Sequence, residues 1–196
     1  MREVELKAVL DSWTERRARL LAAGAERVFE GRIEDRRYDT NERSLAMRDI
    51  VLRLRTYRDG RSARTELEFK GPSASESGYK VRDEVGSTVS DPAAVASMLA
   101  GLGYIVTRAI DRDIEQFDIG GAMVRFERYP RMDDLVEVEG EPEALERAIA
   151  TLGIARAEFT AERLQECAAR DELRTRRRAA ISDGELAEHS PMARER

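Results

Sequence analysis

The chain has 196 residues, of which 41% are hydrophobic, and it carries a formal net charge of −5 at pH 7. A chain of this length buries about two thirds of its unfolded surface, so one folded domain with a tail is expected. The acidic balance excludes a dedicated nucleic-acid binder, whose phosphate contacts demand a basic face, but it allows a small polyanion in a basic pocket.

The first predicted strand covers residues 3 to 7, where charged and apolar side chains alternate with the period of a β-strand. The same alternation of charge returns at Arg53/Arg55, Glu66/Glu68/Lys70, Arg82/Glu84, Arg125/Glu127 and Glu137/Glu139. Two carboxylates at this spacing, roughly 6 to 7 Å, repel by about 2 kcal/mol at an effective dielectric near 20. Facing cations or bound metal ions would offset the repulsion, which favours strands curled around a polar interior. A half-exposed antiparallel sheet is the alternative.

Three helices are predicted from their start and stop signals, over residues 12 to 24, 91 to 103 and 142 to 153. Each closes on a glycine that is followed by an apolar residue, which is common helix-stop chemistry. Ser12 is the predicted cap of the first helix, and Trp13 is expected to pack that helix onto the sheet.

The remaining segments are predicted to be strands joined in hairpins, at residues 33 to 40, 48 to 58, 62 to 70, 79 to 89, 104 to 118, 121 to 129 and 134 to 140. Between two of them, the small and polar residues 71 to 78 are expected to form a mobile loop. The outline is a set of hairpin strands with a few helices outside.

The C-terminal part begins with helical composition from about Ala157, with Thr160 as the predicted cap. The Arg-rich run 174 to 178 is expected to be a solvated helix face. Beyond about Ser182 the composition predicts a disordered tail, which contains the only histidine, His189. We therefore expect a folded domain over residues 1 to 170, followed by a helical extension and tail over residues 171 to 196.

Several function classes are excluded by what the chain lacks. With no histidine in the folded part and one cysteine, Cys167, zinc sites and His- or Cys-based nucleophilic machinery are excluded. There is no Gly-x-x-x-x-Gly-Lys-Ser/Thr loop of a P-loop enzyme. No disulfide, signal peptide or run of roughly 18 apolar residues is present. We expect a cytoplasmic protein with no membrane and no nucleic-acid partner.

Carboxylates are the remaining candidate metal ligands, and all-oxygen sites favour hard cations such as magnesium or manganese. The candidate ligands are Glu3, Glu5, Glu137 and Glu139. The cationic side chains of the same faces fit phosphoryl oxygens, because arginine offers a forked donor and lysine a compact charge. These candidates are Arg53, Arg55, Arg82, Lys7 and Lys70. Candidate metal ligands and arginine side chains on the same strand faces together indicate an enzyme of phosphoryl transfer.

The chain resembles the CYTH family, which joins class IV adenylyl cyclases, thiamine triphosphatases and other triphosphate-processing enzymes. Six motifs follow in the family's order: Glu3-Val4-Glu5-Leu6-Lys7, which resembles the E-x-E-x-K signature, Tyr38-Asp39-Thr40, Leu52-Arg53-Leu54-Arg55, Phe69-Lys70-Gly71-Pro72, Arg82-Asp83-Glu84 and Glu137-Val138-Glu139. The resemblance covers roughly residues 1 to 170, so it implies that the folded domain is a triphosphate tunnel.

The resemblance implies an α+β fold: a closed, eight-stranded antiparallel β-barrel with helices packed outside, which binds a small triphosphate with Mg or Mn. The residues it implies as metal ligands are Glu3, Glu5, Glu127, Glu137 and Glu139, although the family often has an aspartate where this chain has Glu127. The residues it implies for the phosphates are Lys7, Arg53, Arg55, Lys70, Arg82 and Arg112. Lys7 is also the candidate catalytic group that takes a proton from the nucleophile.

Three functions remain open at this point. The first is a metal-dependent triphosphatase in which water attacks a terminal phosphorus. The second is a class IV adenylyl cyclase, in which the ribose 3′-hydroxyl attacks the α-phosphorus and pyrophosphate leaves. The third is a polyphosphate-binding module without turnover, which the many carboxylates disfavour, since they would weaken pure anion binding. The oligomeric state is left open, with a homodimer as one option.

Overall fold

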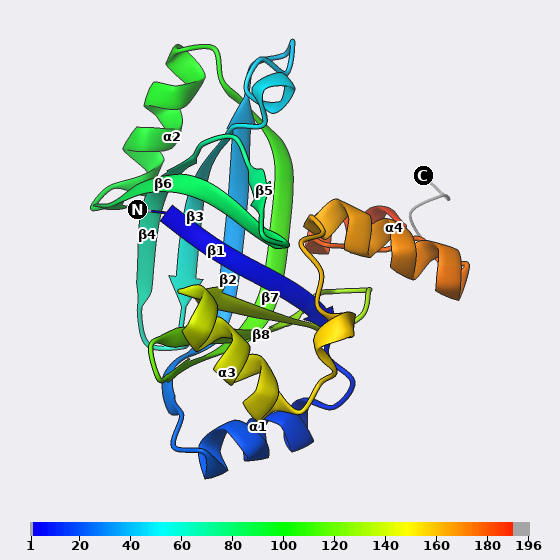
Figure 1. Ribbon diagram of the computed structural model, residues 1–196. Coiled ribbons are helices and arrows are strands. Elements are labelled where there is room, and N and C mark those ends of the chain that lie inside the picture. The colour runs from blue at the N-terminus through cyan, green and yellow to red at the C-terminus, as the bar shows by residue number, and fades with distance from the viewer. Residues whose placement is uncertain (1, 190–196) are drawn as a thin grey trace.

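The computed structural model describes residues 2 to 189, without the side chains of residues 2 and 3. Nine strands and five α-helices form in this part of the chain (Figure 1). The strands are β1 (Arg2–Val9), β2 (Glu26–Asp39), β3 (Val51–Arg58), β4 (Ala63–Lys70), β5 (Ala74–Glu76), β6 (Tyr79–Val89), β7 (Ile105–Ile119), β8 (Ala122–Arg128) and β9 (Leu135–Gly140). The helices are α1 (Trp13–Ala22), α2 (Pro92–Gly101), α3 (Pro142–Leu152), α4 (Leu164–Thr175) and α5 (Asp183–Glu188), with 3-10 turns η1 (Ala46–Arg48) and η2 (Arg156–Glu158).

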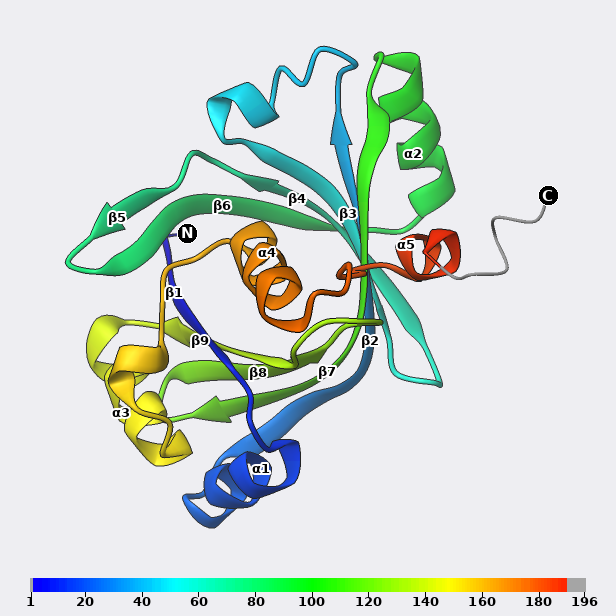
Figure 2. The same cartoon turned by 90° about the vertical axis from the view of Figure 1, so that its right-hand side faces the viewer.

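Eight of the strands close a barrel through antiparallel pairings. Their order is β1-β9-β8-β7-β2-β3-β4-β6, and a pairing between β1 and β6 completes the ring. Strand β5 pairs with β6 and adds a ninth strand outside the ring. Figure 2 looks into the ring. The predicted α+β fold with a closed eight-stranded barrel is confirmed.

All eight predicted strands form, and the structure adds two strand segments that were not predicted. Strand β2 begins at Glu26 instead of residue 33, because residues 26 to 32 pair with residues 113 to 118 of β7. Strand β5 lies inside the predicted loop and pairs with residues 79 to 81 of β6. Both additions depend on a partner strand, which local composition does not reveal.

The three predicted outer helices form, and their ends carry the expected signals. The Ser12 hydroxyl accepts a hydrogen bond from the backbone N–H of Glu15 at 3.3 Å at the start of α1. The Asp91 carboxylate accepts one from Ala94 at 2.9 Å at the start of α2. Helix α3 ends at Gly153, whose φ of 70° is left-handed. None of the helices in the described chain is long and apolar enough to cross a membrane.

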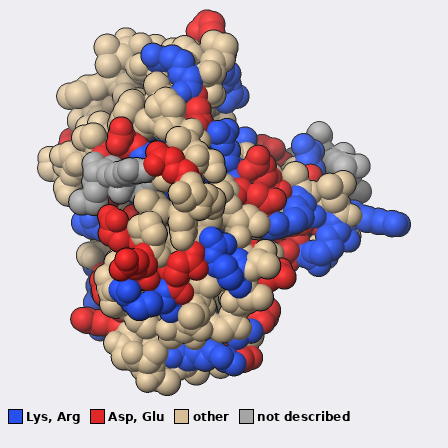
Figure 3. Space-filling view, in the orientation of Figure 1, with Lys and Arg blue, Asp and Glu red and all other residues tan. Residues whose placement is uncertain are grey.

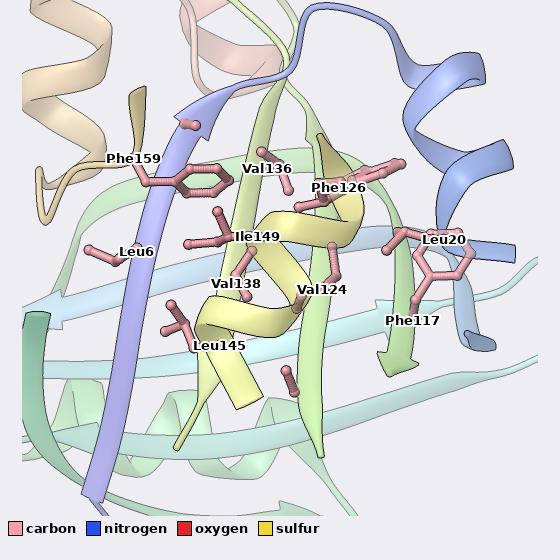
Figure 4. Packing of buried hydrophobic residues seen from close by; sticks show 14 of the residues in the cluster. Leu6, Leu20, Phe117, Val124, Phe126, Val136, Val138, Leu145, Ile149 and Phe159 are labelled. Carbon is pink, nitrogen blue, oxygen red and sulfur yellow. The ribbon is translucent and has the colours of Figure 1, made fainter. Parts of the chain in front are cut away.

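The main hydrophobic core lies outside the barrel, between its wall and helices α1 and α3 (Figure 4). Alternate residues of β1, β8 and β9 point outward into this core, since side chains alternate across a strand. The ring of Phe126 lies 5.5 Å from the rings of both Trp13 and Phe117. The predicted packing of Trp13 onto the sheet is therefore confirmed. A core outside the wall leaves the inward-facing positions available for charged side chains.

Helix α4 lies across one end of the barrel and appears within the ring of strands in Figure 2. Its Leu164 and Cys167 pack in one apolar cluster with Ile110 of β7, Leu135 of β9 and Tyr129. An apolar contact thus closes this end of an otherwise polar interior.

The segment leading into α4 differs from the prediction. Thr160 was expected to cap a helix, and this prediction is wrong: its backbone pairs with that of Lys7 through two hydrogen bonds of 2.8 and 2.9 Å. Helix α4 begins only at Leu164. The pairing with β1 therefore holds residue 160 in extended conformation.

The chain beyond α4 returns to the barrel. The predicted domain end at residue 170 falls inside α4, and the backbone N–H of Asp111 in β7 donates to the carbonyl of Ile181 at 2.8 Å. Helix α5 forms at the start of the predicted disordered tail, where the Ser182 hydroxyl accepts from the N–H of Glu185 at 3.2 Å. Residues 190 to 196 of that tail lie outside the described residues.

Charged side chains line the barrel interior, and Asp35 of β2 links three of the arginines there. Its carboxylate accepts hydrogen bonds from Arg55 at 2.7 and 2.9 Å, from Arg112 at 3.1 Å and from Arg53 at 3.5 Å. Burial alone would raise the pKa of the Asp35 carboxyl, but the three arginines hold that pKa well below its usual range. The ionised carboxylate therefore ties β3 and β7 to β2.

Truncation of the outer core should destabilise the protein strongly. We expect Phe126→Ala to lower the free energy of unfolding by about 3 to 5 kcal/mol, because it opens a cavity between two aromatic rings. Urea unfolding measures the loss. Phe69→Ala is the matched control, because Phe69 is 42% exposed. Equal losses in the two variants would contradict the placement of the core.

Removal of the Asp35 charge should also destabilise the fold. We expect Asp35→Asn to lower the free energy of unfolding at pH 7 by about 3 to 5 kcal/mol, because three buried arginines lose their shared counter-ion. The lowered pKa of Asp35 means that its contribution is present above the unfolded-state pKa and is lost as the pH falls below about 4. Urea unfolding from pH 7 to pH 3 should show a smaller difference between the two proteins at acid pH. A constant difference would contradict this.

Candidate functional site

A cavity of about 420 Å³ occupies the barrel interior. Its walls carry twelve lysines and arginines against seven aspartates and glutamates. The cavity therefore has an excess of positive charge, although the whole chain has a net charge of −5. Positive charge inside low-dielectric walls attracts and concentrates small anions.

Strand alternation brings most of the predicted site residues into this cavity. On β1, Glu5 and Lys7 line the cavity, whereas Leu6 and Ala8 are 1% exposed in the outer core. The predicted residues that line the cavity are Glu5, Lys7, Arg53, Arg55, Lys70, Arg82, Arg112, Glu127 and Glu137.

Two predicted metal ligands are placed differently. Glu139 lines an adjoining cavity of about 280 Å³. Glu3 lies on β1 opposite Arg82 of β6 in the register, and its side chain lies outside the described residues. The residues common to both cavities are Arg53, Arg55, Lys70 and Arg125. A basic partition therefore separates the two spaces.

Lys7 joins two of the predicted metal ligands. Its Nζ lies 2.6 Å from a carboxylate oxygen of Glu137 and 2.9 Å from one of Glu5. Arg125 Nη1 lies 2.7 Å from the other oxygen of Glu137. Burial alone would lower the pKa of Lys7, but Glu137 and Glu5 raise that pKa above its ordinary value. Lys7 is therefore an ammonium ion, and in this state it cannot accept a proton.

Glu127 has both carboxylate oxygens engaged. One accepts from Arg112 Nε at 2.8 Å, and the other accepts from the Tyr129 hydroxyl at 2.6 Å. Burial and the neighbouring Glu127 charge raise the pKa of Tyr129, so this phenol remains a donor. In this arrangement Glu127 orients Arg112, and its role as a metal ligand would require these bonds to open.

Arg82 holds the rim of the cavity. Its guanidinium donates to the carbonyl of Gly71 at 2.9 Å through Nε and to that of Asp49 at 2.9 Å through Nη2. The Asp49 carboxylate in turn accepts from the backbone N–H of Ser73 at 2.7 Å. Arg82 therefore fixes the segment after β4 against the segment after η1, in addition to lining the cavity.

The charged residues of the cavity that are absent from the predicted set include Asp35, Arg37, Arg108 and Arg125. The signal that identifies them is the same period-two alternation, along residues 33 to 39 of β2 and 108 to 112 of β7. Arg125 already shows that alternation with Glu127. The roles of the other three depend on which strands flank β2, and that information lies in the register.

The carboxylates have the donor chemistry of a hard divalent cation, but they do not form a closed cage. In the part of the chain that the structure describes, no three His, Cys, Asp or Glu residues are placed to hold a metal ion. Glu5 and Glu137 do converge on one cation, the Lys7 ammonium. Magnesium commonly takes one or two protein carboxylates together with substrate phosphate oxygens. Glu5 and Glu137 fit that mode of binding.

Solved structures share this fold. A Vibrio parahaemolyticus protein, named as a candidate adenylate cyclase, is 21% identical with a TM-score of 0.73, over 85% of this chain and 97% of that chain. A Pyrococcus horikoshii protein is 21% identical with a TM-score of 0.70, over 89% and 99%. A Hippeastrum protein, named as a candidate adenylyl cyclase with a dominant triphosphatase activity, is 16% identical with a TM-score of 0.59, over 82% and 90%. At these identities the likeness shows the fold alone.

The sequence itself places the chain in a family. No curated protein matches it. The sequence profile of the CYTH domain, however, matches residues 1 to 187, which include all nine strands and all but the last residue of α5. The chain therefore belongs to the CYTH family.

Proposed function

We propose that this protein is a metal-dependent triphosphatase, which binds inorganic triphosphate, thiamine triphosphate or a nucleoside triphosphate and hydrolyses its terminal phosphate. The observation that carries the proposal is the excess of twelve lysines and arginines over seven acidic residues around one cavity. A linear triphosphate supplies several negative charges in a narrow shape. It would neutralise this excess along the length of the barrel.

The arginines are held in position before any ligand arrives. Asp35 occupies Nε and Nη2 of Arg55, and Glu127 occupies Nε of Arg112. Each guanidinium has five N–H donors, so donors remain for phosphoryl oxygens. Donors oriented in advance stabilise developing charge without reorganisation at the moment of reaction. Arg53, Arg55 and Arg112 would therefore grip the phosphates and stabilise the transition state.

The carboxylates and Lys7 would act at the reacting end. Water attacks the terminal phosphorus, the P–O bond to the next phosphoryl group breaks, and orthophosphate leaves beside the shortened chain. The Lys7 ammonium would contribute positive charge there rather than act as a base. Glu5 and Glu137 would hold a divalent cation, which when bound supplies charge neutralisation and orientation of the attacking water.

An adenylyl cyclase is the alternative, because three of the structural neighbours are named as candidate cyclases. A cyclase needs a place for adenine. The aromatic residues among the cavity's lining are Tyr38 and Tyr129, and both are buried. In the adjoining cavity, the Arg64 guanidinium carbon lies 4.4 Å from the centre of the Tyr57 ring, and the Phe29 ring packs edge-on against the same ring. This lining therefore suits a hydrolase that contacts only the phosphates better than it suits a cyclase that must also bind adenine.

Turnover should give orthophosphate and depend on the cavity carboxylates. Phosphorus NMR of tripolyphosphate, thiamine triphosphate and ATP with Mg²⁺ or Mn²⁺ should show orthophosphate from at least one of them. Glu5→Gln and Glu137→Gln should each lower kcat by about 100-fold or more, because charge stabilisation in the site is lost. Glu143→Gln, in the exposed first turn of α3, is the control. Pyrophosphate with cyclic AMP would show a cyclase, and unchanged rates in both variants would reject the assigned carboxylates.

Metal binding should depend on phosphate. Because Glu5 and Glu137 are already paired with Lys7, we expect Mn²⁺ to bind the free protein weakly and to bind at least about tenfold more tightly with a nonhydrolysable triphosphate analogue present. Manganese EPR titration measures both affinities, with a titration of the analogue alone subtracted. Tight binding of Mn²⁺ without the analogue would contradict this mode of binding.

A further inference from the structure

Three arginines lie in one row across three neighbouring strands. In the strand register, Arg37 of β2 is opposite Arg53 of β3 on one side and opposite Arg108 of β7 on the other. All three line the barrel cavity. Like charges directly opposite one another destabilise a sheet.

Two members of this row form no ion pair with any residue that the structure describes. Arg53 donates to Glu68 Oε2 at 3.0 Å. Among the residues that the structure describes, however, no carboxylate lies within ion-pair distance of Arg37 or Arg108, and the buried Nε of Arg37 has no hydrogen-bond acceptor. Asp35 still attracts Arg37 through space, but neither Arg37 nor Arg108 forms an ion pair among the described residues.

The two carboxylates nearest along β2 are engaged elsewhere. Asp35, on one side of Arg37, bonds Arg55, Arg53 and Arg112. Asp39, on the other side, accepts from the backbone N–H groups of Thr40, Leu45 and Ala46 at 2.8 to 2.9 Å. Neither carboxylate therefore forms an ion pair with Arg37, although sequence spacing alone would make them its natural partners.

The charge of Arg37 is costly to hold. Burial and repulsion from Arg53 and Arg108 lower the pKa of the Arg37 guanidinium, and the attraction by Asp35 offsets only part of this effect. On the outer face shown in Figure 3, Lys and Arg side chains are interspersed with Asp and Glu. Arg37 and Arg108 form no such ion pairs among the described residues, and an anion from solution would supply the missing partner.

From this geometry we propose that Arg37 and Arg108 form a subsite for the phosphoryl group at one end of a linear phosphate chain, the end that does not react beside Glu5 and Glu137. The proposal rests on the proposed function and adds two residues to its binding machinery. A phosphoryl group fits because paired guanidinium forks can donate to several of its oxygens at once. A phosphate chain that reaches this row would also contact Arg53, which belongs both to the row and to the basic partition between the two cavities.

The test uses the full-length chain and calorimetric titration at fixed ionic strength. The probes are a nonhydrolysable imido analogue of tripolyphosphate and, separately, orthophosphate. The variants are Arg37→Gln, Arg108→Gln and Arg37→Lys, with Arg61→Gln in the exposed turn after β3 as the charge-matched control. Thermal unfolding of each variant without ligand accompanies the titrations.

Each glutamine variant should bind the analogue roughly 10- to 100-fold more weakly than the Arg61→Gln control, the loss expected for charged hydrogen bonds. Arg37→Lys should be intermediate, because it keeps the charge and loses the fork. Without ligand, the midpoint of Arg37→Gln should equal or exceed that of the wild type, since repulsion is relieved. A purely structural arginine would instead lower this midpoint.

Unchanged affinity for the analogue in both glutamine variants would overturn the subsite. If one variant fails to fold, the affinity of the other variant alone decides whether the subsite exists. Equal weakening of orthophosphate and analogue binding would overturn the chain-end assignment in favour of a free phosphate ion. A wild type that binds and hydrolyses triphosphate while the variants match the control rejects only this subsite. A wild type that neither binds nor hydrolyses triphosphate rejects the proposed function.

Discussion

The inner wall of this barrel depends on the bonds between the buried Asp35 carboxylate and three arginines on two flanking strands. The apolar core lies outside the wall, so hydrophobic burial does not organise the interior. Without a carboxylate at this point, Arg53, Arg55 and Arg112 would face one another in a region of low dielectric. The ion pairs therefore do inside the barrel what apolar packing does outside it: they fix the positions of neighbouring strands. They also hold the guanidinium groups in the directions in which a phosphate chain would meet them.

Stability and the proposed function oppose each other in the same cavity. Full pairing of all charges would stabilise the empty protein, but it would leave no donor for an anion. The seven acidic residues compensate part of the basic set, but Arg37 and Arg108 form no ion pair among the described residues. A ligand that supplies negative charge would then stabilise the fold as it binds. Violations of ordinary charge pairing are expected at functional sites for this reason.

Lys7 connects the candidate reaction centre to the helix that closes the barrel. Its side chain joins Glu5 and Glu137, while its backbone pairs with Thr160, four residues before α4 begins. Helix α4 then covers one end of the interior with the apolar side chains Leu164 and Cys167. The position of this helix and the position of the carboxylates are thus set by one strand, β1.

The sequence by itself determined which segments become strands and which face of each strand is charged, because alternation of side chains is a local property of the extended chain. It also determined the family, because the E-x-E-x-K pattern and the later Arg, Lys and Glu pairs occur in a fixed order. Only the tertiary structure decided the partners: that Asp35 serves three arginines, that Asp39 turns to backbone amides, and that Arg37 lies between Arg53 and Arg108. These relations are set by the register of β2 against β3 and β7, and register depends on contacts between residues far apart in the chain. The same reason explains why the early start of β2, strand β5 and the pairing of Thr160 with Lys7 could not be predicted, since each requires a partner strand that the local sequence does not specify.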